Sequence, residues 1–279
     1  VLQVRDLLLP RQDAFGVDLI DVSLQVRSGE VVGIAGVSGN GQQELLRALS
    51  GEDTRAQPAM VQVTGQDVAR LGPQQRRALG LHFVPEERLG RGAVPTMGLA
   101  HNLLLTRSDA VGAMGWLHLG QLKAQARAII ERFGVKAGGA DAPARSLSGG
   151  NLQKFIVGRE IAAQPKLIII AQPTWGVDVG AAAQIHAEIL ALRDAGCAVL
   201  IVSEELDELF ELSDRLYVLA KGHLSPSVAR ADATVQQVGE WMSGLWNADV
   251  QQHLADMEQV LPSSEAAQAN AQVKGPQHV

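Results

Sequence analysis

The sequence predicts an α/β fold with a mostly parallel sheet, an antiparallel β segment before it and a helical insertion within it. Two continuous apolar stretches, residues 166–171 and 197–203, flank a segment of helical periodicity at 181–196. This β-α-β pattern is typical of a parallel sheet covered by helices on both faces. A third apolar run, residues 31–37, leads into a glycine-rich turn and a further helical segment.

Two stretches near the N-terminus, residues 1–9 and 20–29, show partial alternation of apolar and polar side chains. Such alternation is typical of strands with one buried face, so we expect an antiparallel β subdomain here. After the glycine-rich turn, residues 42–50 carry leucines at helical spacing, and Gly51 offers a C-cap. The buried face of this helix is predicted to hold Leu45, Leu46 and Leu49.

Helical patterns dominate from about residue 90 to residue 150, which predicts a helical subdomain. Its clearest helix ends at Gly134 and carries on one face Leu122, Ala126, Ile129 and Phe133. Residues 247–279 are polar and alanine-rich and offer little to bury, so we expect a disordered tail there. The folded unit is therefore predicted to span residues 1–246.

The composition favours a packed globular protein and excludes some partners. Hydrophobic residues make up 46% of the 279 and charged residues 19%. The balance of 24 basic and 30 acidic residues gives a net charge of −6, which argues against nucleic acid as a partner. The one cysteine, Cys197, cannot form an intrachain disulfide and is predicted to be a buried thiol.

The ends and the apolar stretches of the chain carry two further expectations. No apolar stretch approaches the roughly 18 to 20 residues of a membrane span, so we do not expect the chain to cross a bilayer. The sequence begins with Val1 rather than methionine, which leads us to expect a domain taken from a longer protein.

The first chemical motif is the turn GVSGNGQQ at residues 36–43. Its three glycines, Gly36, Gly39 and Gly41, lie between a buried strand and a helix, where backbone N–H groups can surround a phosphate. Ser38 lies in the same turn. The full pattern, G-x-x-x-x-G-K-[ST], adds a lysine for the phosphates and a hydroxyl for magnesium. Here these two positions hold Gln42 and Gln43. Since a hydrogen bond to a charged group contributes about 1.5 to 3 kcal/mol, losing the lysine should weaken nucleotide binding by about one to two decades.

The second motif is the end of the apolar strand in LIIIAQPT, residues 167–174. P-loop ATPases place an aspartate and often a glutamate there, for magnesium and for the attacking water. This chain has Ala171 and Gln172 instead. General-base assistance, worth about 10²- to 10⁴-fold, is therefore expected to be absent.

The third motif, SLSGGN at residues 146–151, opens another helix. Ser148, Gly149 and Gly150 place a hydroxyl and free backbone N–H groups at a helix N-terminus, which predicts a second anion site. The apolar face of that helix is predicted to hold Leu152, Phe155, Ile156 and Ile161.

These motifs, with QPTWGVDVGA at 172–181 and LIVSEELDEL at 200–209, closely resemble the ATP-binding subunits of ABC transporters. The nearest similarity is to the second, C-terminal nucleotide-binding domain of the tandem ATPases of sugar and nucleoside importers. The resemblance runs from about Val1 to Gly244 and includes five motifs in the same order. It implies a P-loop ATPase core with a β subdomain and a helical subdomain.

The resemblance also implies roles for single positions. Residues 36–43 match the phosphate loop, and FVPEERLGRG, residues 83–92, matches the segment that senses the transmembrane subunit, with Glu86 where many members have glutamine. Leu147 to Asn151 matches the signature motif. Asp178 matches the aspartate of the loop that contacts the second domain, and Glu204 stands where many members place a histidine.

All departures from the family pattern affect the resident site. The lysine, hydroxyl, aspartate, glutamate, glutamine and histidine of the resident site are replaced, whereas the signature and the dimer loop remain. The resemblance therefore implies that this domain completes the ATP site of a partner domain, while its own site holds nucleotide weakly or not at all. The implied cofactors are ATP and Mg²⁺, with Mg²⁺ mainly at the partner's site and no metal ligands here.

The implied partners are a competent nucleotide-binding domain fused upstream, transmembrane permease subunits and, indirectly, a solute-binding protein. The implied location is peripheral, on the cytoplasmic face of the inner membrane. Two other hypotheses stay open: a soluble ABC ATPase acting on ribosomes or nucleic acid, and a scaffold that never binds nucleotide. The transported solute is not encoded in these residues, because importers select it in other subunits.

Overall fold

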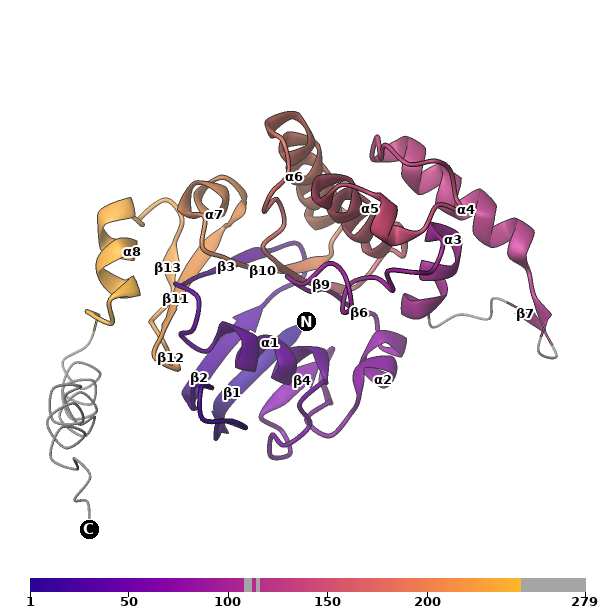
Figure 1. The fold of residues 1–279 in the computed structure, drawn as a ribbon. Coiled ribbons are helices and arrows are strands. Elements are labelled where there is room, and N and C mark those ends of the chain that lie inside the picture. The colour runs from indigo at the N-terminus through magenta and orange to yellow at the C-terminus, as the bar shows by residue number, and fades with distance from the viewer. Residues whose placement is uncertain (108–111, 114–115, 247–279) are drawn as a thin grey trace, which may run out of the picture.

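A mostly parallel sheet forms the centre of the molecule. The structure, a computed structural model, describes residues 1–107, 112–113 and 116–246. The strand order of this sheet is β12-β11-β3-β10-β9-β6, with β13 also paired to β11 (Figure 1). Its strands are β3 Val31–Ala35, β6 Leu81–Val84, β9 Leu167–Ala171, β10 Ala198–Ser203, β11 Arg215–Ala220, β12 His223–Leu224 and β13 Val228–Ala229. All pairs from β11 to β6 are parallel, and only β12 and β13 add antiparallel, which confirms the predicted sheet.

A second, fully antiparallel sheet has the order β2-β1-β4-β5. Its strands are β1 Leu2–Leu9, β2 Leu19–Val26, β4 Val61–Val63 and β5 Gln66–Asp67. The pairing of β1 with β2 confirms the antiparallel β subdomain expected from the alternation in sequence. The pairing of β4 with β1 was not predicted. A short pair, β7 Gly112–Ala113 with β8 Trp116–Leu117, stands apart from both sheets.

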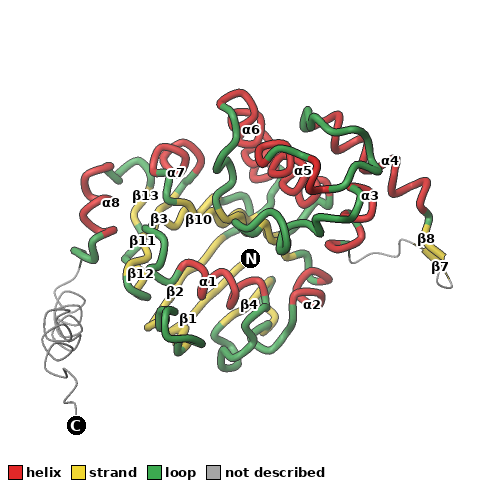
Figure 2. Tube along the Cα trace, viewed as in Figure 1, coloured by secondary structure: helices red, strands yellow, loops and turns green. Residues whose placement is uncertain are grey.

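The helices divide between the two faces of the central sheet. They are α1 Gln42–Ser50, α2 Pro73–Ala78, α3 Leu99–Asn102, α4 Leu119–Arg132, α5 Gly149–Ala162, α6 Val179–Asp194, α7 Leu206–Leu212 and α8 Val235–Met242, with 3₁₀ turns η1 Leu104–Thr106 and η2 Ala144–Ser146. Helices α3 to α6 lie on one side of the sheet, and α1 lies on the other with the antiparallel sheet (Figures 1 and 2).

Alternate residues of the central strands therefore enter two separate cores. On β9, Ile168 and Ile170 pack with the helices α3 to α6, whereas Leu167 and Ile169 pack with α1 and the antiparallel sheet. All five residues of β9 are buried. Burial on both faces is the reason why the sequence shows continuous apolar runs here instead of alternation.

Helix α4 confirms the predicted apolar face, since all four of its predicted core residues are buried and Gly134 follows it with a φ of 55°. Helix α1 likewise buries its three leucines and ends at Gly51. Helix α5 differs from the prediction of one apolar face. It buries every residue from Leu152 to Ile161, because it lies between α4 and α6 beneath β6.

Charged groups buried on α5 are paired within the protein. Glu160 accepts hydrogen bonds from Arg159, at 2.8 Å, and from Arg77, at 2.6 Å, and contacts His82 at 2.8 Å. Burial alone would raise the pKa of Glu160, but Arg159, then His82 and Arg77, hold it at about 2. This cluster ties α5 to β6 and α2, and so fixes the helix whose start carries the third motif.

Cys197 is 4% exposed, as predicted, and burial raises the pKa of its thiol to about 12. In the described part of the chain, no helix combines the length and apolar character that a membrane span requires. The predicted tail, 247–279, lies outside the described residues. The domain limits at 1–246 and the helical subdomain at about 90–150 stay predictions.

Candidate functional site

The glycine-rich turn joins β3 to α1, with backbone conformations that need glycine. Gly39 and Gly41 have φ angles of 85° and 107°. At Gly36, an added Cβ would lie 2.6 Å from the carbonyl oxygen of Leu219. The turn therefore has the close-packed backbone of a phosphate loop, with the start of α1 at its end.

The side chain of Gln42 folds back onto this loop. Its Nε2 donates to the carbonyl of Val37 at 2.8 Å, and its Oε1 accepts from the N–H of Asn40 at 3.0 Å. The amide also lies against Gly36, since an added Cβ there would be 2.3 Å from Nε2. Gln42 thus uses one of the N–H groups that a phosphate would need and fills space inside the loop.

The positions predicted for the resident site come together in one small cavity. It is lined by Gly36, Ser38, Gly39, Gln42, Gln43, Leu46, Glu86, Ala171, Gln172, Val202, Ser203 and Glu204. Of the predicted residues of this site, only Gly41 does not line it. The cavity volume is about 20 Å³, which is room for about one water molecule. A triphosphate does not fit unless these side chains move.

The strand end at Ala171 and Gln172 is closed by its own hydrogen bonds. The N–H of Gln172 donates to the carbonyl of Val202 at 2.9 Å. Its side-chain oxygen accepts from the hydroxyl of Ser203 at 3.2 Å and from the N–H of Glu204 at 3.3 Å. Ala171 is buried. The amide of Gln172 is held between two strand ends, and an amide is too weak a base near neutral pH to accept a proton from a water.

The charged groups of this cavity are carboxylates. Among the described residues that line it, there is no lysine or arginine, and the acidic residues are Glu86 and Glu204. Burial raises the pKa of Glu86, and the nearby charges of Glu204 and Glu87 raise it further. The described side chains that line the resident cavity therefore include two carboxyl groups and no cation, where the family's pattern has a lysine.

The start of α5 is built differently. Ser148 is its N-cap, and the hydroxyl oxygen of Ser148 accepts from the side-chain Nδ2 of Asn151 at 2.8 Å. The Oδ1 of Asn151 accepts from the N–H of Lys136 at 2.8 Å. Asn151 thereby fixes the start of the helix to the loop before it. The N–H groups of Gly149 and Gly150, in the first helical turn, have no partner inside the helix.

The segment 174–178 lies directly against this helix start. An added Cβ on Gly150 would be 3.3 Å from the carbonyl oxygen of Gly176. Asp178 caps α6 by accepting from the N–H of Ala181 at 3.0 Å. The residues matched to the signature and to the dimer loop therefore form one continuous surface, although Asn151 and Asp178 are 27 positions apart in the sequence.

Two residues that support this surface were not predicted from the sequence. Gln153, 1% exposed, donates to the carbonyl of Pro173 at 3.0 Å and accepts from Nε of Arg88 at 3.1 Å. Arg88 also donates to the carbonyl of Trp175 and stacks over its ring, 5.0 Å from the centroid. A glutamine within a run of apolar helix residues was the available signal for Gln153. Arg88 lies within residues 83–92, which the resemblance matched to the sensing segment, but nothing in the local pattern indicates its contact with the start of α5.

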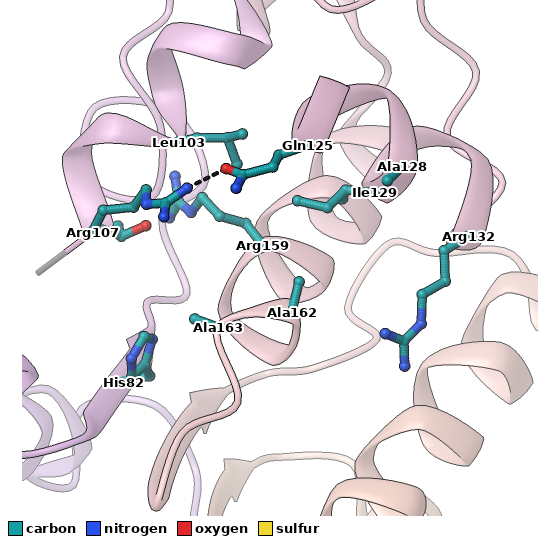
Figure 3. A pocket seen from close by; sticks show the side chains of 11 residues that line it. His82, Leu103, Arg107, Gln125, Ala128, Ile129, Arg132, Arg159, Ala162 and Ala163 are labelled. Atoms are coloured by element: carbon teal, nitrogen blue, oxygen red, sulfur yellow. Dashed lines mark hydrogen bonds between the residues drawn. The ribbon is translucent and has the colours of Figure 1, made fainter. Parts of the chain in front are cut away.

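Two adjoining cavities lie beside β6 and α5. One, of about 500 Å³, is lined by α4 and α5, with Arg107 donating to Gln125 and with Arg159 nearby (Figure 3). The other, of about 530 Å³, shares Thr106, Arg107 and Arg159 with it and reaches Pro85, Arg91 and Gly92. We call the two together the lateral groove. Part of the predicted sensing segment therefore lines the lateral groove, together with Arg159 of α5.

Comparisons with known proteins give the family of the chain. The ABC transporter family model matches residues 19–175. Guanosine import ATP-binding protein NupO of Bacillus subtilis (strain 168) is 39% identical over 236 residues, which cover 84% of this chain and 46% of that protein. Nucleoside import ATP-binding protein NupA of Lactococcus lactis subsp. cremoris (strain MG1363) is 37% identical over 246 residues, 88% of this chain and 48% of that protein. The chain belongs to the ABC transporter family.

Solved structures show the fold of this ABC transporter domain. One, described as the ATP binding subunit of an ABC transporter, has a TM-score of 0.67 at 20% identity and covers 91% of this chain and 99% of that chain. Another, a nucleotide-free ATP-binding cassette from an ABC transporter, has a TM-score of 0.67 at 22% identity, with 90% and 96% covered. The chain spans less than half the length of the two import proteins named above.

ATP and Mg²⁺ are the cofactors of this family, and the two anion sites of this ABC transporter domain differ in how they fit them. The resident cavity does not fit, because Gln42 occupies the loop and Ala171 and Gln43 offer no carboxylate or hydroxyl to a metal. Within residues 1–107, 112–113 and 116–246, no group of three or more His, Cys, Asp or Glu side chains is arranged around a possible metal position. The start of α5 fits an anion, since Ser148 and Gly149 are exposed at the N-terminus of a capped helix.

Proposed function

We propose that this chain is the nucleotide-binding domain of an importer for simple sugars or nucleosides whose resident ATP site is degenerate. Its signature surface completes the ATP site of a partner domain. The observation that carries this proposal is the contrast between the two anion sites. One is filled by Gln42 and edged by carboxylates, and the other is capped, open and beside a guanidinium.

The resident side is proposed to contribute little to hydrolysis. Gln42 lacks the charge that stabilises the phosphates, and Ala171 and Gln172 lack the groups that hold magnesium and accept a proton. The neutral amide of Gln172 is also engaged by Ser203 and Glu204. Three chemical functions are therefore absent from one cavity.

The signature side is proposed to act on a nucleotide held by the partner. Ser148, Gly149 and Gly150 present a hydroxyl and N–H groups that suit phosphate oxygens, and the dipole of the 14-residue α5 adds partial positive charge. Trp175, 57% exposed, and Val179, 88% exposed, flank Asp178 with apolar side chains of the kind that a protein partner covers.

The lateral groove supports the proposal that permease subunits are partners. Pro85, Arg91 and Gly92 from the predicted sensing segment line it together with Leu104 and Leu105, the latter 48% exposed. A groove with apolar and cationic walls suits a short segment of another protein. A solute-binding protein would then interact with the assembly only through the permease.

Two further parts of the proposal follow from the relatives. Because the import proteins NupO and NupA are more than twice as long as the matched region, we propose a competent nucleotide-binding half fused upstream. A domain bound to permease subunits would lie on the cytoplasmic face of the inner membrane, as a peripheral component.

The direct test is the ATPase activity of the purified chain. We expect turnover far below the roughly 1 s⁻¹ of slow ordinary enzymes, because the resident groups are missing. Steady-state phosphate release at saturating Mg²⁺-ATP measures it, with the same preparation in excess chelator as the blank. Chelator-sensitive turnover of about 1 s⁻¹ that follows the protein through purification would contradict the proposal.

Binding experiments test the two other hypotheses from the sequence, a soluble ABC ATPase and a scaffold that never binds nucleotide. A tagged chain that retains ribosomes or RNA, and no membrane subunit, would replace the importer by a soluble ABC ATPase. A chain whose signature-site probe is not protected by a non-hydrolysable ATP analogue in the assembly would be a scaffold. Protection there supports the proposed function.

A further inference from the structure

Arg88 lies at the junction of three parts of the domain. Its backbone belongs to the turn 87–93, in which the N–H of Ala93 donates to the carbonyl of Arg88 at 2.7 Å and the N–H of Gly92 donates to the carbonyl of Glu87 at 2.9 Å. Gly92 also lines the lateral groove and accepts from Arg159 at 3.0 Å. The position of Arg88 therefore depends on the segment that borders this groove.

The guanidinium of Arg88 reaches the signature surface on both of its sides. An added Cβ on Gly149 would lie 2.6 Å from Nη1, and one on Gly176 would lie 3.3 Å from Nη2. The group also donates to Gln153 and to the carbonyl of Trp175, and stacks on the Trp175 ring. It thus lies between the start of α5 and the segment 174–178.

These contacts give Arg88 two physical effects. A planar fork with several donors fixes the relative position of the groups that it joins more firmly than a single ammonium does. Arg88 also remains charged at every working pH, so it adds a full positive charge next to the helix N-terminus at Gly149. Among the described residues, the contacts of the guanidinium are with an amide, a carbonyl and an indole ring, none of which carries a negative charge that would cancel it.

We propose that Arg88 is a positioning residue that holds the signature helix start and the dimer-loop segment as one surface, places a positive charge beside the nucleotide phosphate of the partner site, and links that surface to the lateral groove. This inference rests on the proposed function, because it requires that the signature surface meets a nucleotide.

The experiment uses the purified importer assembly that contains this chain, with ATP titrated in a steady-state ATPase assay. Arg88→Met keeps the length of the side chain and removes its charge and donors. We expect kcat to fall about 10²-fold, as for other single electrostatic donors. The KM for ATP should stay near the wild-type value, because the partner's own loop binds the nucleotide before the two domains close.

Arg88→Lys separates the charge from a purely structural role. Lysine keeps the positive charge but not the fork, so its kcat should lie about tenfold above that of Arg88→Met. Equal losses in the two variants would overturn the charge assignment. Thermal unfolding of each assembly shows whether both variants fold.

Arg230 offers a matched control away from both anion sites. It also donates to a carbonyl, that of Phe210 at 2.6 Å, and stacks over the same residue's ring at 5.2 Å. Arg230→Met should retain wild-type turnover. Wild-type turnover in Arg88→Met would overturn the inference.

Ser148→Arg in the same assembly distinguishes failure of the inference about Arg88 from failure of the proposed function. If Ser148→Arg abolishes turnover while Arg88→Met does not, the inference about Arg88 fails and the proposed function stands. If Ser148→Arg leaves turnover unchanged, the proposed function fails and the inference falls with it.

Discussion

Helices α1 and α5 both begin at glycine-rich turns, yet their N-termini offer an anion opposite environments. Helix α1 has Gly41 as its N-cap, with no capping side chain, and the amide of Gln42 occupies the turn before it. Helix α5 has Ser148 as its N-cap, with Asn151 and Arg88 beside it. Carboxylates of Glu86 and Glu204 border the first cavity, and a guanidinium borders the second helix start.

We infer from this difference that glycine spacing and a helix dipole do not by themselves make an anion site. The dipole is equivalent to about half a charge, so one carboxylate beside it reverses the local field and one guanidinium strengthens it. Anion binding depends on which side chains already accept hydrogen bonds from the N–H groups and on which charges lie next to those groups.

The largest effect that would test this contrast is expected from Ser148→Arg in the assembled importer. An arginine at the N-cap fills the space in front of the α5 N–H groups and blocks approach of a phosphate. Because losing even one such donor costs about 10² to 10³ in rate, we expect ATP hydrolysis and transport to be abolished. Solute-stimulated ATPase and uptake in vesicles measure the two.

The matched comparison for that variant is Gln172→Ala, together with replacements of Ala171. These change the resident cavity and should leave near-normal hydrolysis and transport. Near-normal activity in Ser148→Arg would mean that the start of α5 serves no nucleotide. A large loss in Gln172→Ala would mean that the resident side takes part in the chemistry after all.

A smaller effect is expected from Gln42→Lys in the isolated chain. The substitution removes the acceptor that uses the Asn40 N–H and adds a positive charge. ATP binding should tighten by about one to two decades, while hydrolysis should stay absent because Ala171 and Gln172 are unchanged. Titration calorimetry beside an ATPase assay measures both quantities.

Gln42→Met is the control for that experiment, because it removes the hydrogen bonds of the amide at similar side-chain size and without adding charge. Binding that tightens equally in Gln42→Met would assign the effect to removal of the amide alone. Recovered hydrolysis in Gln42→Lys would show that the strand end at Ala171 and Gln172 can still support the reaction.

The smallest effect concerns the carboxylate of Glu86 and pH. Its pKa is raised by burial and by Glu204 and Glu87, so ionisation is less favourable in the folded chain than in the unfolded chain. The stability that Glu86 contributes is fully present below its unfolded pKa and is lost as pH rises through the raised value. Glu86→Gln, which cannot ionise, should raise Tm by about 2 °C or less at pH 8 and not at pH 4.

Thermal unfolding at the two pH values measures this difference, and Glu87→Gln controls for removing one negative charge from the same turn. An equal gain in Tm at pH 4 and pH 8 would contradict the prediction, because it would show that the gain does not come from ionisation of Glu86.

Much of the fold follows from the sequence, because periodicity reflects burial directly. Strands β3, β9 and β10 are continuous apolar runs since both of their faces are covered, and α4 shows its one buried face. Strands β4 and β5 were missed, because both are very short, and because the pairing of β4 with β1 joins residues about sixty positions apart while β5 pairs only with β4.

The candidate sites were predictable only as far as local patterns reach. Glycine spacing located the turn at 36–43 and the helix start at 148–151. The folded-back amide of Gln42 depends on a side-chain conformation, and the contacts of Arg88 depend on a segment some sixty residues from Gly149. Linear patterns contain neither kind of information.

The hydrogen bonds of Gln42 have a thermodynamic consequence for the whole assembly. A loop that needs a nucleotide to satisfy its donors gains stability as RT ln(1 + [L]/Kd) when the nucleotide concentration rises. The loop at residues 36–43 satisfies part of its donors with its own side chain and should gain little. In a cell that runs short of ATP, we therefore expect the competent half to loosen first, while this half keeps its shape and remains a fixed surface on which its partner can close again.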